Sequence, residues 1–187
     1  MTSDFSILLA RHPPVLGGDG LCYGRKEMPL APGWESFVSR WAGEGRIYAS
    51  PSSRCRMAAE RMGGSEGVQT DERLLEMDFG SWEGQKWSDI PRHALDDWAE
   101  ELFDYRPGGG EAVGELVRRV TAFWEHVFQQ GESCRVVTHG GPLRVLQALA
   151  DNRPFRAEDP APPQGTATLL HFSNKKRSFV APEIGLR

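Results

Sequence analysis

Two histidines lie where short apolar runs of this 187-residue chain end. Arg11 and His12 follow residues 5–10, and His139 follows residues 135–138. Runs of this length and composition are typical of buried parallel strands, whose ends meet at one edge of a sheet. A neutral imidazole is a nucleophile at physiological pH, and a neighbouring guanidinium disfavours the protonated ring. We therefore expect His12 and His139 to meet in one pocket beside Arg11.

A second basic group follows another strand-like run. Residues 46–50 are expected to form a strand, serines follow it, and Arg54 falls in the first turn of a predicted helix over residues 53–62. Gly140 begins a further helix directly after His139. The N-terminal amides of a helix favour an anion, and arginine binds phosphate through forked donors. Two helix starts, two histidines and two arginines predict a site for a phosphoryl group.

A carboxyl group is needed if a histidine attacks phosphorus, because the departing alkoxide requires a proton. A carboxyl group held beside a phosphate dianion keeps its proton and can supply it. Residues 75–84 offer Glu76 as the candidate acid, and Asp78 and Glu83 remain competing choices.

The elements that must position these residues alternate between strands and helices. Apolar residues recur at steps of three and four over 113–128, which predicts a long amphipathic helix. Glu111 precedes this helix and is expected to complement its dipole. A helix with Pro142 near its first turn is expected to run to Ala150. Residues 167–172 and 178–180 are expected to form a hairpin around a turn at 174–177. The pattern predicts a three-layer α/β/α sandwich with a mostly parallel central sheet.

One domain over residues 1–187 accommodates these elements, with a small helical cap over roughly 82–110 above the carboxyl ends of the strands. The cap segment is rich in aromatic side chains. They could cover a flat ring of a ligand, but their helical spacing favours packing in the core. These side chains are Trp87, Trp98, Phe103 and Tyr105.

Composition excludes several classes of protein. The net charge of −4 gives no general attraction to nucleic acid, and no apolar run approaches the roughly 18 residues of a membrane span. No secretory signal is recognised, so a cytoplasmic protein is expected. Cys22, Cys55 and Cys134 are scattered and expected to be reduced and packed. Neither a metal site nor a cofactor is indicated. The expected partner is a small phosphorylated metabolite, bound by a monomer or a homodimer.

Five segments, taken in order, resemble the motifs of the histidine phosphatase superfamily, in its phosphoglycerate-mutase-like branch. The resemblance implies that His12 accepts the phosphoryl group as a phosphohistidine. It implies that Arg11, Arg54 and His139 hold the phosphate, and that Glu76 gives a proton and later activates water. The segments are residues 9–12, 50–54, 76–84, 107–111 and 137–141.

Residues 20–30 are similar to the corresponding stretch of α-ribazole phosphatases of cobalamin synthesis. This narrower resemblance implies removal of the 5′-phosphate from the ribazole nucleotide. Tyr23 and Arg25 would then hold the leaving group, or they close a turn. Two alternatives remain open, namely a general sugar-phosphate phosphatase and a catalytically silent module that binds a phosphorylated ligand.

The chain departs from the family pattern at two places. Pro13 replaces the usual glycine after the first histidine, and Gly17, Gly18 and Asp19 stand where an asparagine is common. Since proline has no N–H, residue 13 cannot donate a backbone hydrogen bond to phosphate. The phosphate is therefore expected to depend on the basic side chains and on His139.

Overall fold

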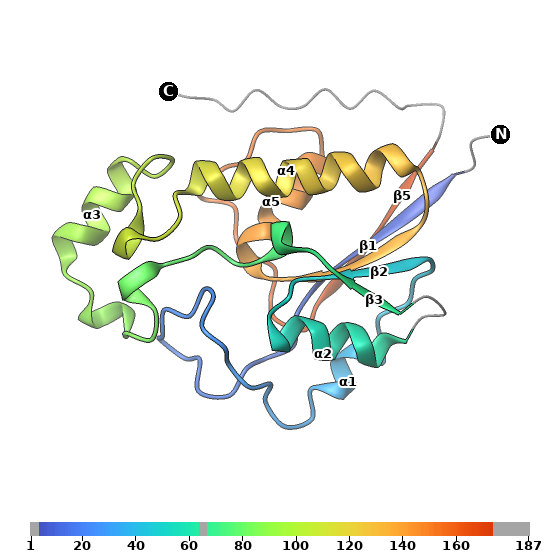
Figure 1. Ribbon diagram of the computed structural model, residues 1–187, viewed down its shortest axis with the longest axis horizontal. Helices are drawn as coiled ribbons and strands as arrows, with labels where there is room; N and C mark the ends of the chain where they lie inside the picture. Colours follow the sequence, from blue (N-terminus) through green and yellow to red (C-terminus); the bar gives the residue numbers. More distant parts are fainter. Residues whose placement is uncertain (1–3, 64–66, 174–187) are drawn as a thin grey trace.

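The computed structural model describes residues 4–63 and 67–173, which form one sheet with helices on both faces (Figure 1). The strand order is β3-β2-β4-β1-β5. β1 and β2 both pair with β4 in parallel, β3 pairs with β2 in parallel, and β5 pairs with β1 antiparallel at the edge. The strands are β1 Phe5–Arg11, β2 Arg46–Ala49, β3 Val68–Thr70, β4 Cys134–Thr138 and β5 Ala167–Phe172.

The apolar runs of the sequence are needed because the central strands are buried on both faces. Along β1, Ile7 and Leu9 pack into one core, whereas Leu8 and Ala10 pack into another core on the opposite face. Alternate side chains of a strand point to opposite faces, so a strand covered on both sides is apolar throughout. The two cores confirm the predicted three-layer architecture.

The helices divide between the two faces. α4 (Val113–Gln130) and α5 (Gly140–Ala150) cover the larger core, and α1 (Glu35–Val38) and α2 (Ser53–Met62) cover the smaller one. α4 buries the predicted apolar stripe and ends at Gly131, whose φ of 65° suits glycine.

The side chain that accepts a backbone N–H at the start of α4 is that of Glu115, not that of Glu111. The side chain of Glu115 accepts the N–H of Ala112 (3.1 Å) and so completes the first turn of the helix. The Glu111 carboxylate instead pairs with Arg119, 2.6 Å from its Nε.

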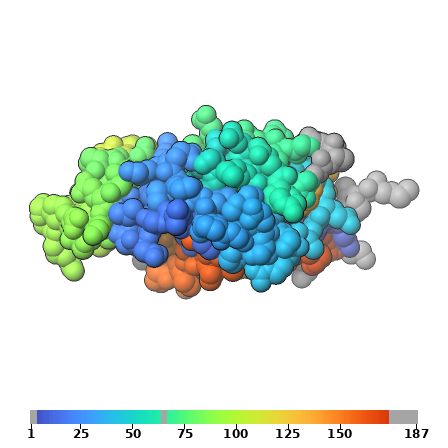
Figure 2. All heavy atoms as spheres, turned by 90° about the horizontal axis from the view of Figure 1, so that it is seen from below, coloured from blue at the N-terminus to red at the C-terminus, as the bar shows by residue number. Residues whose placement is uncertain are grey.

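The cap lies beyond one end of the sheet. It contains α3 (Arg92–Glu100) and the short 3-10 turns η2 (Gly80–Trp82), η3 (Trp87–Asp89) and η4 (Pro107–Gly109). Figures 1 and 2 show this light green segment projecting at one end of the molecule, beside the blue N-terminal loops. Main-chain hydrogen bonds join the two, from Cys22 N to Gln85 O (2.9 Å) and from Trp87 N to Gly20 O (2.9 Å).

Parts of the predicted element list differ from the structure. The sequence pattern does not predict β3 or α1, because these elements are only three and four residues long and show little apolar periodicity. The turn at 174–177 and the strand at 178–180 lie outside the described residues. The remaining predicted strands and helices agree with the structure to within two residues at most ends.

The three cysteines are buried and free, as expected. Among the helices between residues 4 and 173, none has both the length and the apolar composition required to cross a bilayer.

Candidate active site

His12 and His139 meet at the end of β1 and β4. The N–H of His12 donates to Thr138 O (3.0 Å), so the pairing of the two strands continues to the residue before His139. The imidazole rings lie edge to face with centroids 5.2 Å apart, and both side chains are almost fully buried. The predicted encounter of the two histidines is confirmed.

A single hydrogen bond fixes the tautomer of His12. Its Nδ1 lies 2.8 Å from the carbonyl oxygen of Pro13. Since a carbonyl oxygen only accepts, Nδ1 carries the proton and Nε2 keeps its lone pair. Burial lowers the pKa of His12 from 6.5 to about 3, the Pro13 carbonyl opposes this effect, and the charges of Arg54 and Arg11 add to it. His12 is therefore a neutral ring with one free nitrogen at neutral pH.

His139 is buried like His12 but does not line the cavity described below. Its Nε2 lies 2.8 Å from Ser50 Oγ and 3.5 Å from Cys55 Sγ. Burial, followed by the charge of Arg54, holds the pKa of His139 well below 6.5. Ser50 at the end of β2 and Cys55 in α2 thus orient this ring.

Arg11 and Arg54 bring two guanidinium groups to the histidines. Arg11 Nη1 donates to Pro162 O (2.6 Å), and Arg54 donates to Lys26 O (2.9 Å) and Gly24 O (2.7 Å). The Nε of each is buried without a partner among the described residues. Because these acceptors are neutral carbonyls, both positive charges remain available to an anion.

The start of α2 does not offer its amides to a ligand as expected. The carboxylate of Glu27 accepts the N–H of Ser53 at 3.2 and 3.1 Å, and Ser53 Oγ also donates to it. A side chain from the N-terminal loop therefore fills the anion position at this helix N-terminus.

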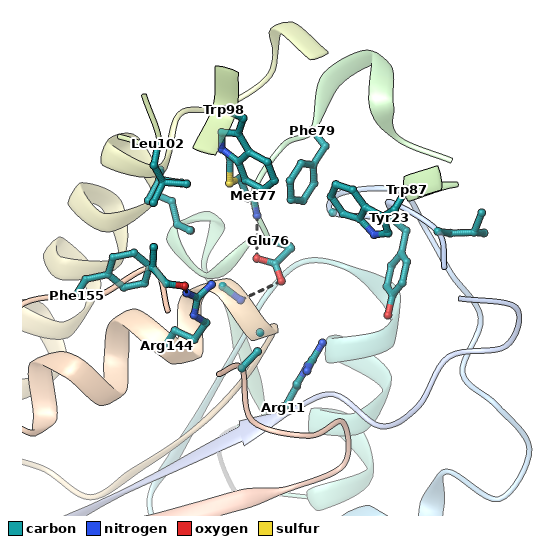
Figure 3. A pocket seen from close by; sticks show the side chains of 18 of the residues that line it. Arg11, Tyr23, Glu76, Met77, Phe79, Trp87, Trp98, Leu102, Arg144 and Phe155 are labelled. Atoms are coloured by element: carbon teal, nitrogen blue, oxygen red, sulfur yellow. Dashed lines mark hydrogen bonds between the residues drawn. The ribbon is translucent and has the colours of Figure 1, made fainter. Parts of the chain in front are cut away.

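A cavity of about 360 Å³ opens in front of His12. Figure 3 shows Glu76 near its centre, with Arg11 on one side and an aromatic wall on the other. The Glu76 carboxylate accepts the N–H of Gly141 at Oε2 (3.1 Å) and the N–H of Met77 at Oε1 (3.0 Å). His12, Arg11, Glu76 and Gly140 all line this cavity, whereas Arg54 and His139 are not among its lining residues.

The competing carboxylates have other partners and do not line the cavity. Glu83 accepts the backbone N–H groups of Arg25 (2.8 Å), Lys26 (2.6 Å) and Phe79 (3.1 Å). Asp78 accepts the N–H of Gly80 at 2.8 Å. Of the three acids left open by the sequence, only Glu76 faces the cavity.

Tyr23 and Arg25 differ in their position relative to the cavity, which only Tyr23 lines. Tyr23 lines the cavity, and its hydroxyl accepts a hydrogen bond from Gln164 Nε2 (2.7 Å). The Arg25 guanidinium instead lies 3.3 Å from Glu111 Oε2 and 3.3 Å from the carbonyl oxygen of Glu76. Arg25 does not line the cavity, so the expectation that it holds substrate is corrected.

Arg144 is a cavity residue that the sequence did not reveal. It lies on α5, one turn after Gly141, and its guanidinium carbon is 5.1 Å from the centre of the Phe155 ring. Nη2 donates to Arg156 O (3.3 Å) and to Ala157 O, while Nη1 has no partner among the described residues. Because an arginine in a helix is usually exposed to solvent, nothing in the sequence singles out Arg144. Its place in the cavity depends on contacts with the 151–166 segment, which only the folded structure shows.

The cap aromatics divide between the lining of the cavity and packing on other rings. Trp87 and Trp98 line the cavity with Phe79, whose ring meets each of them edge to face at 5.4 and 5.8 Å. Tyr105 packs on Trp82, and Phe103 packs on a further ring. Within residues 4–63 and 67–173, no group of His, Cys, Asp and Glu side chains is arranged to hold a metal ion.

Curated proteins with recognisable similarity are matched over only part of their own length. The chain is 32% identical over 109 residues to a Hydrogenobacter thermophilus protein named "Putative phosphoserine phosphatase 2", covering 55% of this chain and 54% of that protein. It is 26% identical over 121 residues to "Bifunctional protein Rv2228c" of Mycobacterium tuberculosis, covering 61% of this chain and 33% of that protein.

Solved structures match over most of the chain. A phosphoglycerate mutase from Thermus thermophilus has a TM-score of 0.71 and 26% identity, covering 89% of this chain and 92% of that one. A "putative alpha-ribazole-5'-P phosphatase" from Escherichia coli has a TM-score of 0.77 and 23% identity, covering 91% and 92%. The fold is therefore phosphoglycerate-mutase-like. The sequence also matches the family described as "Histidine phosphatase superfamily (branch 1)" over residues 7–184, and the chain belongs to this superfamily.

Proposed function

We propose that this protein is a metal-independent phosphomonoesterase that transfers the phosphoryl group of its substrate to Nε2 of His12. The observation that carries the proposal is the hydrogen bond from His12 Nδ1 to Pro13 O, at 2.8 Å. It leaves Nε2 unprotonated and holds the ring in one orientation at the cavity. The same carbonyl stabilises the positive charge that the ring acquires when Nε2 bonds to phosphorus.

The first step forms the Nε2–P bond and breaks the bond from phosphorus to the leaving oxygen. Glu76 gives its proton to that oxygen, so the leaving group departs as an alcohol. Arg11 and Arg54, whose bonds in the structure are to neutral carbonyls, supply the positive charge for the phosphate. His139 adds a donor when the phosphate dianion favours its protonated form.

The second step uses the same groups in reverse. The Glu76 carboxylate takes a proton from a water molecule, the water oxygen bonds to phosphorus, and the Nε2–P bond breaks. Inorganic phosphate leaves, and His12 and Glu76 return to their starting protonation states. The proposal needs no metal ion, because the arginines neutralise the phosphate charge.

For the substrate we propose α-ribazole 5′-phosphate or a related nucleotide-like monoester. The cavity next to Glu76 is walled by Phe79, Trp87 and Trp98, and these rings suit a flat, apolar leaving group. The similarity of residues 20–30 to α-ribazole phosphatases supports the same assignment, and Tyr23 of that stretch lines the cavity.

A second candidate is a small-molecule phosphatase whose leaving group carries a carboxylate, as phosphoserine does. Arg144 favours it, because this cavity arginine keeps Nη1 free of partners among the described residues. A guanidinium binds a carboxylate through paired hydrogen bonds. The Hydrogenobacter relative bears the name of a phosphoserine phosphatase.

A panel of monoesters tests these assignments. The protein is incubated with 4-nitrophenyl phosphate, α-ribazole 5′-phosphate, phosphoserine and a sugar phosphate, in a buffer containing a metal chelator, and released phosphate is measured. The proposal predicts turnover that the chelator does not abolish, with the highest kcat/KM on α-ribazole 5′-phosphate. Binding of phosphate esters without turnover of any of them would instead identify a phospho-ligand-binding module.

A further inference from the structure

Glu76 belongs to a stretch of backbone without regular structure. The turn η1 (Glu72–Leu74) ends before it, and η2 begins at Gly80. The main chain at Glu76 is therefore not held by the backbone hydrogen bonds of a helix or strand of its own. Buried backbone groups in such a stretch require partners, and the groups that supply them also fix its geometry.

Arg119 supplies those partners from α4. Its Nη2 donates to the carbonyl oxygen of Glu76 (3.1 Å), and its Nη1 donates to the carbonyl oxygen of Arg73 (2.7 Å). One guanidinium thus holds the chain at Glu76 and three residues before it. The planar fork of arginine fixes the direction of both bonds, which a lysine cannot do.

Glu111 holds Arg119 in place and also contacts the main chain at Asp78, two residues after Glu76. Its two carboxylate oxygens accept from Arg119 Nε (2.6 Å) and Nη2 (2.8 Å), and the side chains are 10% and 17% exposed. Glu111 Oε2 accepts the N–H of Asp78 (3.4 Å), and the N–H of Glu111 donates to Asp78 O (2.8 Å). The pair therefore holds the backbone both before and after the acid.

We propose that Arg119, oriented by Glu111, is a positioning residue that sets the Glu76 carboxyl group at the distance and angle needed for proton transfer to the leaving oxygen. This inference rests on the proposed role of Glu76 as the acid. Neither Arg119 nor Glu111 lines the cavity, so both act through the backbone of Glu76. Catalytic groups must be held to within about 0.5 Å of their productive geometry, and their supporting contacts provide that accuracy.

The test compares two leaving groups in the variant R119K, which keeps a positive charge opposite Glu111 but loses the fork. With an alkyl phosphate, whose leaving oxygen must be protonated, kcat/KM falls roughly 10- to 100-fold. With 4-nitrophenyl phosphate, whose leaving group departs without a proton, kcat/KM stays within about threefold of wild type, because kcat/KM reports formation of the phosphoenzyme and not its hydrolysis by the water that Glu76 activates. The variant E111Q shows the same selective loss, because it weakens the hold on Arg119.

R73K is the matched control. Arg73 is in the same segment and pairs with Asp71 at 2.6 Å, and its side chain also donates to the carbonyl oxygen of Ala122 rather than to the backbone at Glu76. It is expected to leave both rates unchanged. A general structural effect of R119K would lower the two rates equally and would overturn the inference.

A double variant separates this inference from the proposed function. In the E76Q background, R119K should lower the alkyl phosphate rate no further, since both changes remove one function. Additive losses would overturn the positioning role even if E76Q alone behaves as an acid variant should. If E76Q itself fails to show selective loss on the alkyl phosphate, the assignment of the acid is wrong instead.

Discussion

The main-chain N–H of Gly141 donates a 3.1 Å hydrogen bond to Oε2 of Glu76, so the first turn of α5 holds the proposed acid. His139 directly precedes that turn. One helix start therefore fixes His139, the proposed phosphate ligand, and Glu76, the proposed acid, relative to each other, although the two lie far apart in sequence. A Cβ atom at position 141 would overlap Oε1 of Glu76, an overlap that only glycine avoids.

We expect the substitution Gly141→Ala to displace the Glu76 carboxylate while the rest of α5 is kept. The kcat/KM for an alkyl phosphate should fall roughly 10- to 100-fold, because small displacements of a catalytic group cost this much. The kcat/KM for 4-nitrophenyl phosphate, whose leaving group needs no proton, should fall far less. Steady-state kinetics on both esters, with circular dichroism to confirm the fold, measure this. An equal loss on both would contradict the role of Gly141.

Arg144→Ala tests which leaving group the cavity accepts. If Arg144 binds a carboxylate of the leaving group, KM for phosphoserine should rise about tenfold, the effect of losing one charge-assisted hydrogen bond. KM for 4-nitrophenyl phosphate should change little. Arg153→Ala is the control, because that arginine pairs with Asp159 at 2.5 Å and does not line the cavity. An unchanged KM for phosphoserine would remove the support for the second candidate.

Trp98→Ala tests the other candidate substrate, a monoester with a flat leaving group that packs on the aromatic wall. If the ring packs on a flat leaving group, KM for α-ribazole 5′-phosphate should rise roughly 5- to 10-fold, as expected for the loss of about 1 kcal/mol of aromatic contact. KM for phosphoserine should stay near wild type. Tyr105→Leu, which alters a ring packed on Trp82 outside the cavity lining, should change neither value. A loss shared equally by both substrates would show that Trp98 acts only in packing.

The depressed pKa of His12 predicts how stability depends on pH. The folded protein keeps His12 neutral down to about 3, whereas the unfolded chain takes up a proton below 6.5. The unfolded state therefore binds more protons in this window, and the free energy of unfolding falls as the pH drops from 6.5 toward 3. The contribution of His12 is about 1.4 kcal/mol per pH unit, and none is expected above pH 6.5.

Urea unfolding of wild type and His12→Asn at several pH values measures that contribution. Carboxylates add to the acid sensitivity of both proteins, so the difference between the two slopes isolates His12. The slope should be shallower in the variant. If the free energy of unfolding fell with pH equally in both proteins between pH 6.5 and 3, the fold would not be holding His12 neutral.

The sequence predicts the strand ends well, because short apolar runs such as residues 5–10 are typical of buried parallel strands. From these ends the meeting of His12 and His139 followed. The sequence could not show that Glu27 fills the start of α2, or that Arg25 turns to Glu111. Those side chains find their partners only after long-range folding, since 26 residues separate Glu27 from Ser53 and 86 separate Arg25 from Glu111.

The segment around Glu76 gives the clearest example of this limit. Glu76, Asp78 and Glu83 have the same chemistry and lie close together in sequence, so their types could not rank them. The distant N-terminal loop supplies partners to two of them, because Glu83 accepts the N–H groups of Arg25 and Lys26 and Asp78 lies 3.8 Å from Arg25 Nη1, whereas only Glu76 of the three lines the cavity. The choice among the three is thus made by tertiary contacts.

The central claim is that His12 carries the phosphoryl group, and trapping the phosphoenzyme tests it most directly. The protein is mixed with substrate, denatured in alkali, digested and examined by mass spectrometry for a phosphorylated peptide that loses its phosphate in acid. We predict one phosphoryl group on His12 in the wild type and none in His12→Asn, which should also lack turnover. Turnover by His12→Asn at the wild-type rate, or a phosphoryl group on another residue, would contradict the account.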